Sequence, residues 1–163
     1  MKYLYEMKTE LNMTYIDKIT FMNHVKNFAK KHLGISSDST PYLLEYGLSA
    51  YGKTVSYTFS DGSGLMSYIS INESQELYEM INTILHETRH LEQHIKQPLF
   101  CRVSFKIQKI LNKLNLWNGL TYALSFHEID ARRYARKTMK KYNKELNALI
   151  EKAYNNELDE LLY

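Results

Sequence analysis

The stretch His86-Glu87-Thr88-Arg89-His90 has the form H-E-x-x-H and lies in a run of sequence with helical periodicity. Two histidines four residues apart lie one above the other on one face of a helix, so both imidazoles can reach the same metal ion. Glu87 projects beside that face, where its carboxylate could act as general base on a metal-bound water. The motif therefore predicts a zinc site with His86 and His90 as ligands and Glu87 as catalytic base.

The residues around the motif predict the helix that carries it. Apolar side chains recur at three- and four-residue spacing and can form one buried stripe, which consists of Leu77, Ile81, Ile84, Leu85 and Leu91. Ser74 is a plausible N-cap for this helix, and Pro98 predicts a break near its other end.

The rest of the chain is organised around this helix. An amphipathic helix is expected over residues 14–33, followed by three short strands near residues 42–46, 54–59 and 65–71. Further helices are expected near residues 100–114 and from about residue 120 towards 153. We find no linker, so the prediction is a single α+β domain over residues 1–163, with a small antiparallel sheet of three strands.

Composition limits the class of protein. The chain has 163 residues, of which 44% are hydrophobic and 24% charged, as in a globular domain with a core of its own. No apolar run is long enough to span a bilayer. The single cysteine, Cys101, cannot form an internal disulfide, which favours a reducing compartment such as the cytoplasm. Any zinc would then be held by histidine and carboxylate rather than by a set of thiolates.

The basic residues are concentrated in one part of the chain. Residues 132–144 include seven Lys or Arg and no acid, although the net charge of the whole chain is only +3. On a helix these cations form two neighbouring stripes, which could contact nucleic-acid phosphates or an acidic protein partner. We favour a solvated face, because a small net charge does not by itself indicate nucleic-acid binding.

A catalytic zinc site needs a third protein ligand. His94 lies about 12 Å along the helix axis from His86, so one ion cannot reach both. The segment 126–135 offers three candidates, namely His127, Glu128 and Asp130. They point in different directions, and small side chains near the Glu128 side favour close helix approach there. Spacing alone leaves all three open, and a His, His, Glu set would also suit manganese or iron.

Over residues 56–139 the chain resembles the ImmA/IrrE family of small zincin metallopeptidases. One anchor is a strand followed by the H-E-x-x-H helix, and the other is residues 128–135, similar to the family pattern E-x-[ED]-A-x-x-[FY]-A. The resemblance implies a minimal zincin fold, Zn²⁺ held by His86, His90 and Glu128, and Glu87 as catalytic base. It also suggests a transcriptional repressor as partner and a role in phage or mobile-element regulation.

Two positions depart from the family pattern. Arg89 stands where the family commonly has Gly, and Arg132 stands where it has Asn. These cations leave room for an alternative, a catalytically weak zinc-fold protein that sequesters a regulatory partner. For a peptidase, the oxyanion donor could be Tyr134, Tyr68 or Arg89. We name Tyr134 as the catalytic candidate among them. The sequence as a whole predicts a cytoplasmic zinc-dependent peptidase that acts on a protein or peptide.

Overall fold

Three short strands form a small sheet in the computed structural model, which describes residues 15–33, 42–45, 48, 50–58, 65–113 and 125–158. The strands are β1 (Tyr42–Glu45), β2 (Gly52–Thr58) and β3 (Leu65–Asn72), in the spatial order β1-β3-β2. β2 pairs with β3 in the antiparallel sense, as expected.

The prediction of a wholly antiparallel sheet is wrong, because β1 pairs with β3 in the parallel sense. β1 and β2 run in opposite directions, as the short connection between them requires. β3 lies between these two strands, however, and β1 therefore runs parallel to it. Strand order of this kind depends on contacts distant in sequence, which hydrophobic alternation does not report.

The H-E-x-x-H motif lies on α3 (Leu77–Lys96). The predicted apolar stripe of this helix is confirmed, since each of its five residues is at most 3% exposed. The prediction that Ser74 caps the helix is wrong. Its main-chain N–H and hydroxyl both donate to Asn72 Oδ1, which closes the turn after β3, and the N-cap is Glu76. The helix ends before Pro98, as expected.

The remaining helices are α2 (Tyr15–Leu33), α4 (Pro98–Lys113), α6 (Phe126–Lys141) and α7 (Asn143–Tyr154). α2 and α4 agree with the predicted helices to within two residues, and the long C-terminal helical region is divided at Tyr142. The first residues of the helical region expected from about residue 120 lie outside the described residues. Within the described part of the chain, no helix has the length and apolar character needed to cross a membrane.

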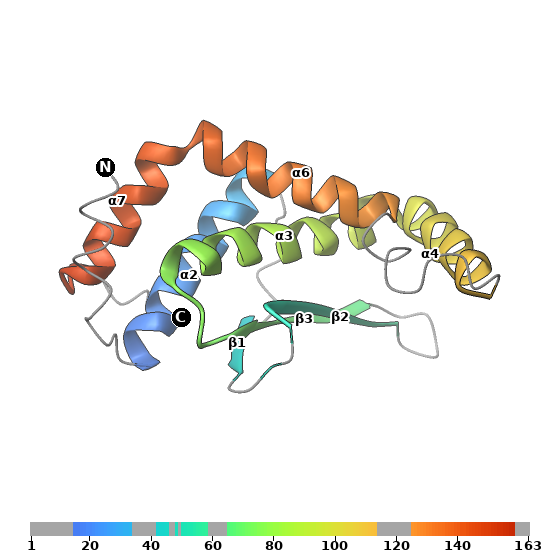
Figure 1. The fold of residues 1–163 in the computed structure, drawn as a ribbon. Coiled ribbons are helices and arrows are strands. Elements are labelled where there is room, and N and C mark those ends of the chain that lie inside the picture. The colour runs from blue at the N-terminus through green and yellow to red at the C-terminus, as the bar shows by residue number, and fades with distance from the viewer. Residues whose placement is uncertain are drawn as a thin grey trace.

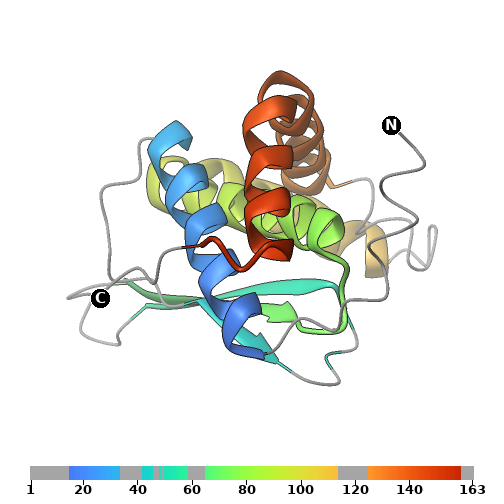
Figure 2. The same ribbon diagram turned by 90° about the vertical axis from the view of Figure 1, so that its left-hand side faces the viewer.

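α3 occupies the centre of the molecule, between the sheet and α6 (Figure 1). α2 and α7 pack against each other and against α3, as the turned view shows (Figure 2). The core between these elements is apolar, and its members include Phe21, Val25, Ile69, Ile71, Ile84, Leu85 and Leu146. Because α3 contacts both the sheet and α6, its polar residues can meet side chains from both sides.

Candidate metal centre

Helical spacing brings His86 and His90 together on the face of α3 directed to α6. Their Nε2 atoms lie 3.0 Å apart, and the ring centroids are 4.6 Å apart with the planes nearly perpendicular. His90 is 8% exposed, whereas His86 is half-buried and reaches a pocket. Two imidazole nitrogens thus converge on one point, as the four-residue spacing predicts.

Glu128 of α6 supplies a carboxylate to the same point. Its Oε2 lies 3.3 Å from His86 Nε2, its Oε1 lies 3.1 Å from His90 Nε2, and the residue is 2% exposed. Ala131 and Ala135 are fully or almost fully buried at the contact between the helices, and their small size lets α6 approach α3 closely. Of the three candidates left open by the sequence, the structure brings Glu128 to the histidines.

The donor atoms of His86, His90 and Glu128 fit a metal ion. All three lie within 4.8 Å of one another, and no other group of three such residues is found in the described part of the chain. Tetrahedral zinc with ligands at 2.0–2.1 Å would separate neighbouring donor atoms by about 3.3 Å. The 3.0 Å separation of the two histidine nitrogens is close to that value, and each nitrogen lies at a similar distance from a different oxygen of Glu128, namely 3.1 Å from Oε1 and 3.3 Å from Oε2.

The electrostatic environment of His90 also favours a cation. Burial disfavours its imidazolium, but the hydrogen bond and charge of Glu128 outweigh burial and raise the pKa of His90 above its ordinary value. The negative field that strengthens proton binding at His90 would equally attract a metal ion.

Gln93 orients the second histidine. Its Oε1 lies 3.0 Å from His90 Nδ1, so a proton on Nδ1 leaves the Nε2 lone pair directed to the centre. Its Nε2 donates to the main-chain oxygen of His127 at 3.1 Å and to Asp130 Oδ2 at 2.8 Å. Gln93 is 1% exposed, and sequence reasoning missed its role. The available signal was an amide three residues after His90, on the same side of the helix.

Asp130 supports the centre indirectly and is not among its ligands. It accepts hydrogen bonds from Gln93 and from Arg89 Nε, the latter at 2.7 Å. Burial disfavours its charge, but these bonds outweigh burial and lower the pKa of the Asp130 carboxyl. Arg89 pairs with Asp130 of α6 as well as with Glu92 of α3, so its side chain lies at the contact between the two helices. Of the two cations that depart from the family pattern, Arg89 therefore does not line the pocket, whereas Arg132 does.

The two other histidines that were considered as ligands, His127 and His94, have other contacts. His127 is buried, and its Nδ1 lies 2.7 Å from Ser104 Oγ of α4. Its Nε2 is 3.9 Å from Glu128 Oε1, and the residue is not part of the three-residue group. His94 stacks on Phe105 with ring centroids 6.2 Å apart. His94 is likewise not part of the three-residue group.

Glu87 lies at the contact between α3 and β2. It is 7% exposed, and its Oε2 accepts a hydrogen bond of 2.7 Å from the Thr54 hydroxyl. The close approach requires glycine at position 52, because a Cβ there would lie 2.5 Å from Thr83 Cγ2 and 3.0 Å from Glu87 Cγ. Nothing in the sequence indicated this role for Gly52, since a contact with a distant helix leaves no local signal.

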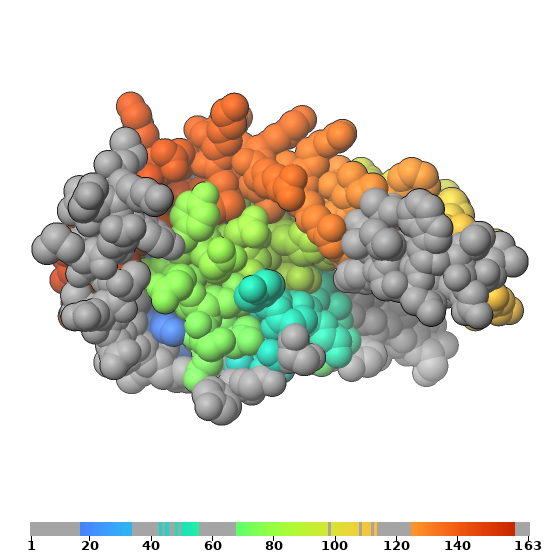
Figure 3. All heavy atoms as spheres, viewed as in Figure 1, coloured from blue at the N-terminus to red at the C-terminus, as the bar shows by residue number. Residues whose placement is uncertain are grey.

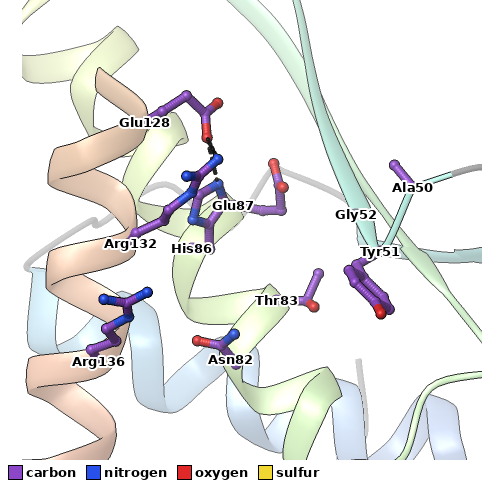
Figure 4. A pocket seen from close by; sticks show the side chains of 10 residues that line it. All are labelled: Ala50, Tyr51, Gly52, Asn82, Thr83, His86, Glu87, Glu128, Arg132 and Arg136. Atoms are coloured by element: carbon purple, nitrogen blue, oxygen red, sulfur yellow. Dashed lines mark ion pairs between the residues drawn. The ribbon is translucent and has the colours of Figure 1, made fainter. Parts of the chain in front are cut away.

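A pocket of about 340 Å³ joins these parts (Figure 4). Residues 50–52 form its wall on the sheet side, and Asn82, Thr83, His86 and Glu87 contribute from α3. α6 contributes Glu128, Arg132 and Arg136. The three elements meet on the face drawn in Figure 3, where β2 is teal, α3 green and α6 orange. The catalytic candidate and two of the candidate ligands therefore share one cavity.

The oxyanion donors suggested by the sequence are not in this pocket. Tyr134 has a buried hydroxyl, its ring centroid lies 5.6 Å from the guanidinium carbon of Arg89, and burial raises the pKa of Tyr134. Tyr68 is half-buried on β3 and also does not line the pocket. The assignment of Tyr134 is therefore corrected, because its side of α6 faces the protein interior. The cations at the pocket are Arg132 and Arg136.

Comparison with known proteins finds no relative. No protein-family model matches the chain, no curated protein matches it, and no solved structure matches it. The resemblance described above therefore rests on the residues of the two motifs. Those motifs lie on α3 and α6, whose side chains meet at the metal centre.

Proposed function

We propose that this protein is a zinc-dependent peptidase that cleaves a protein partner in the cytoplasm. The observation that carries the proposal is the presence of Glu87 in the same pocket as His86 and Glu128. A purely structural metal site does not require a further carboxylate beside its open side. The fold that we propose is a minimal zincin, and the resemblance to the ImmA/IrrE family makes a transcriptional repressor the first partner to examine.

The chemistry divides between the metal and the chain. His86, His90 and Glu128 would hold zinc, which lowers the pKa of a bound water and polarises a peptide carbonyl. The Thr54 hydroxyl fixes one oxygen of Glu87, so the carboxylate is held in one orientation at the pocket. Glu87 can accept a proton from the attacking water and return it to the leaving amine.

An edge of the sheet offers a place for the substrate. β2 is at one end of the strand order, so its outer side does not pair with a described strand. Gly52 begins this strand and lines the pocket close to Glu87. An extended peptide could add to β2 by main-chain hydrogen bonding, which would place its carbonyl groups near the pocket.

The alternative of a catalytically weak sequestering protein rested on two cations, of which Arg132 lines the pocket and Arg89 does not. Arg89 was one reason for that alternative, because a long cation beside the metal could restrict the cleft. Its guanidinium instead pairs with Asp130 and Glu92 at the helix contact. The access to the centre from the pocket therefore does not depend on Arg89.

Elemental analysis of purified protein tests the metal site. We expect about one equivalent of metal, zinc rather than manganese or iron, in the wild type. His90→Ala and Glu128→Ala should lose it, whereas the matched control His94→Ala, on the same helix, should retain it. Folded wild-type protein that takes up no added zinc would overturn the proposal.

Proteolysis tests the catalytic step. Zinc-loaded protein is incubated with a proteome-derived peptide library, and new amino termini are identified by labelling and mass spectrometry. Glu87→Gln should keep its zinc and produce none of the wild-type cleavages. Partner binding that survives this change, with no cleavage by the wild type, would favour the sequestering protein instead.

A further inference from the structure

The pocket has a second end, away from the metal centre. On α3, Asn82 lies one turn before His86 and on the same face, so it extends the stripe of the two ligands. On α6, Arg132 and Arg136 lie one and two turns after Glu128 and extend that stripe in the same way. Asn82 and both arginines line the pocket (Figure 4).

The two stripes face each other because α3 and α6 run in opposite directions. In Figure 1, α3 runs from left to right and α6 from right to left. Asn82, before His86, lines the same pocket as Arg132 and Arg136, after Glu128. Residues before His86 therefore face residues after Glu128. The metal ligands form one end of the pocket, and an amide with two guanidinium groups forms the other.

The cations at this second end are exposed to solvent. Arg132 Nη2 lies 3.7 Å from Glu128 Oε2, a long contact for an ion pair, and the Arg132 side chain is 43% exposed. Arg136 is exposed and forms no ion pair with any residue that the structure describes. Guanidinium groups bind carboxylates well because their planar donors match two oxygens.

The cationic character continues along α6 beyond the pocket. The remaining Lys and Arg residues of that helix are all exposed, namely Arg133, Lys137, Lys140 and Lys141. No acidic residue occurs between positions 131 and 144. A ligand that enters the pocket and extends along α6 would therefore meet positive charge over its whole length outside the metal end.

We propose that the pocket takes an acidic peptide, with a carboxylate side chain bound by Arg136 and Arg132 while the neighbouring main chain passes the metal centre. Arg136 is about 12 Å along α6 from Glu128, and an extended peptide rises about 3.3 Å per residue. The bound carboxylate would thus lie within about four residues of the reacting bond. The peptide as ligand rests on the proposed function.

The same cations could attract a nucleic acid, but the pocket favours a peptide. A nucleic acid carries a phosphate at every nucleotide, including those that would lie beside Glu87 and Glu128. Like charges at that end would oppose its entry. A peptide can carry carboxylates opposite the arginines and a neutral main chain opposite the glutamates.

Fluorescence anisotropy on the full chain tests this inference. The protein carries Glu87→Gln to prevent cleavage, and it is measured with and without added zinc. The probes are a fluorescein-labelled octapeptide with two adjacent glutamates, its counterpart with two glutamines, and a thymidine octanucleotide. The added variant is Arg136→Gln, and the matched control is Lys109→Gln, which removes one exposed cation from α4.

We expect the glutamate peptide to bind more tightly than the glutamine peptide. Loss of one charge-assisted contact in the Arg136→Gln variant should weaken binding of the glutamate peptide roughly tenfold. The glutamine peptide should be unaffected by that change, and Lys109→Gln should alter neither affinity by more than about twofold. Arg136→Glu should reverse the preference in favour of a peptide with two lysines.

Three results would overturn the inference: equal affinity for the two peptides, equal weakening by Lys109→Gln, or tighter Arg136-dependent binding of the oligonucleotide. The test is independent of catalysis, because the protein used cannot cleave. Arg136-dependent binding of the glutamate peptide by a chain that takes up no zinc would therefore refute the peptidase and retain the acidic ligand. Cleavage of peptides by the wild type with no preference for acidic residues would support the peptidase and refute the acidic ligand.

Discussion

The two ends of the pocket are built in opposite ways. At the metal end, His90 and Glu128 are less than 10% exposed and the adjoining Gln93 is almost fully buried, with hydrogen bonds that fix its amide. At the other end, Arg132 and Arg136 are exposed, and Arg136 forms no ion pair with any residue that the structure describes. Groups that must hold a fixed geometry are thus buried, whereas groups suited to a variable ligand remain in solvent.

The largest effect should be the loss of cleavage when Glu87, at the metal end of the pocket, is changed. Glu87→Gln removes the proton acceptor but keeps the size of the side chain, so cleavage should fall by roughly 10²–10⁴-fold. Steady-state rates on any peptide cut by the wild type measure this. Glu79→Gln, the same change at an exposed position of α3, should leave the rate unchanged. Equal losses in both variants would contradict a catalytic role for Glu87.

Metal binding should stabilise the native chain, because the donor atoms are assembled only in the folded state. Zinc at a hundredfold excess over its Kd should add about 2.7 kcal/mol, which raises Tm by roughly 5–10 °C. Differential scanning fluorimetry with and without zinc measures the shift. It should be absent from His86→Ala and present in His94→Ala, and a shift that survives His86→Ala would point to a different site.

Substitutions of Gln93 should show whether its hydrogen bond to His90 strengthens zinc binding or whether Gln93 only fills space in the core. Gln93→Leu keeps a similar volume but removes the hydrogen bond to His90 Nδ1, so zinc affinity should weaken roughly 10–100-fold. Competition with a chromogenic chelator gives the Kd. Gln93→Glu restores an acceptor for His90 Nδ1 but sets a carboxylate oxygen against Asp130 Oδ2 and the main-chain oxygen of His127, so it should recover only part of the loss. Unchanged affinity in the leucine variant would show that His90 needs no such support.

Gly52 should show how closely β2 must pack against the catalytic carboxylate. In Gly52→Ala the new methyl group meets Thr83 Cγ2, which should cost about 1–2 kcal/mol of unfolding free energy. Denaturant unfolding measures the loss. Adding Thr83→Ser removes the opposing methyl and should restore part of it. Additive losses in the double variant would contradict the contact as the cause.

The smallest change in zinc affinity should come from a substitution at the cationic end of the pocket. Arg132→Gln removes a contact of 3.7 Å to Glu128 from an exposed side chain, so zinc affinity should change by less than about threefold. The chelator competition used for Gln93 applies here as well. A loss as large as that of Gln93→Leu would mean that the two ends of the pocket are not separable.

The features that the sequence predicted well depend on local spacing. The histidine pair and the apolar stripe of α3 follow from a repeat of three to four residues, which any helix imposes. Spacing could not choose Glu128 over His127 and Asp130. The choice depends on which side of α6 packs against α3, and small residues allow that close packing. The resemblance of residues 128–135 to the ImmA/IrrE pattern indicated Glu128, and the donor geometry agrees.

The features that the sequence did not predict depend on contacts between distant segments. Tyr134 was a candidate oxyanion donor, yet its hydroxyl is buried and it occupies the inward side of α6. Gly52 matters through its approach to α3, and the parallel pairing of β1 follows from the insertion of β3. None of these contacts alters a local pattern, so periodicity contains no information about them.

The division of the ligands between two helices has a mechanical consequence. A metal ion bound by His86 and His90 on α3 and by Glu128 on α6 would act as a cross-link between segments far apart in the chain. The single cysteine, buried on α4, cannot provide such a link as a disulfide within the chain. Unlike a disulfide, this cross-link could be removed by a chelator and restored without any redox chemistry.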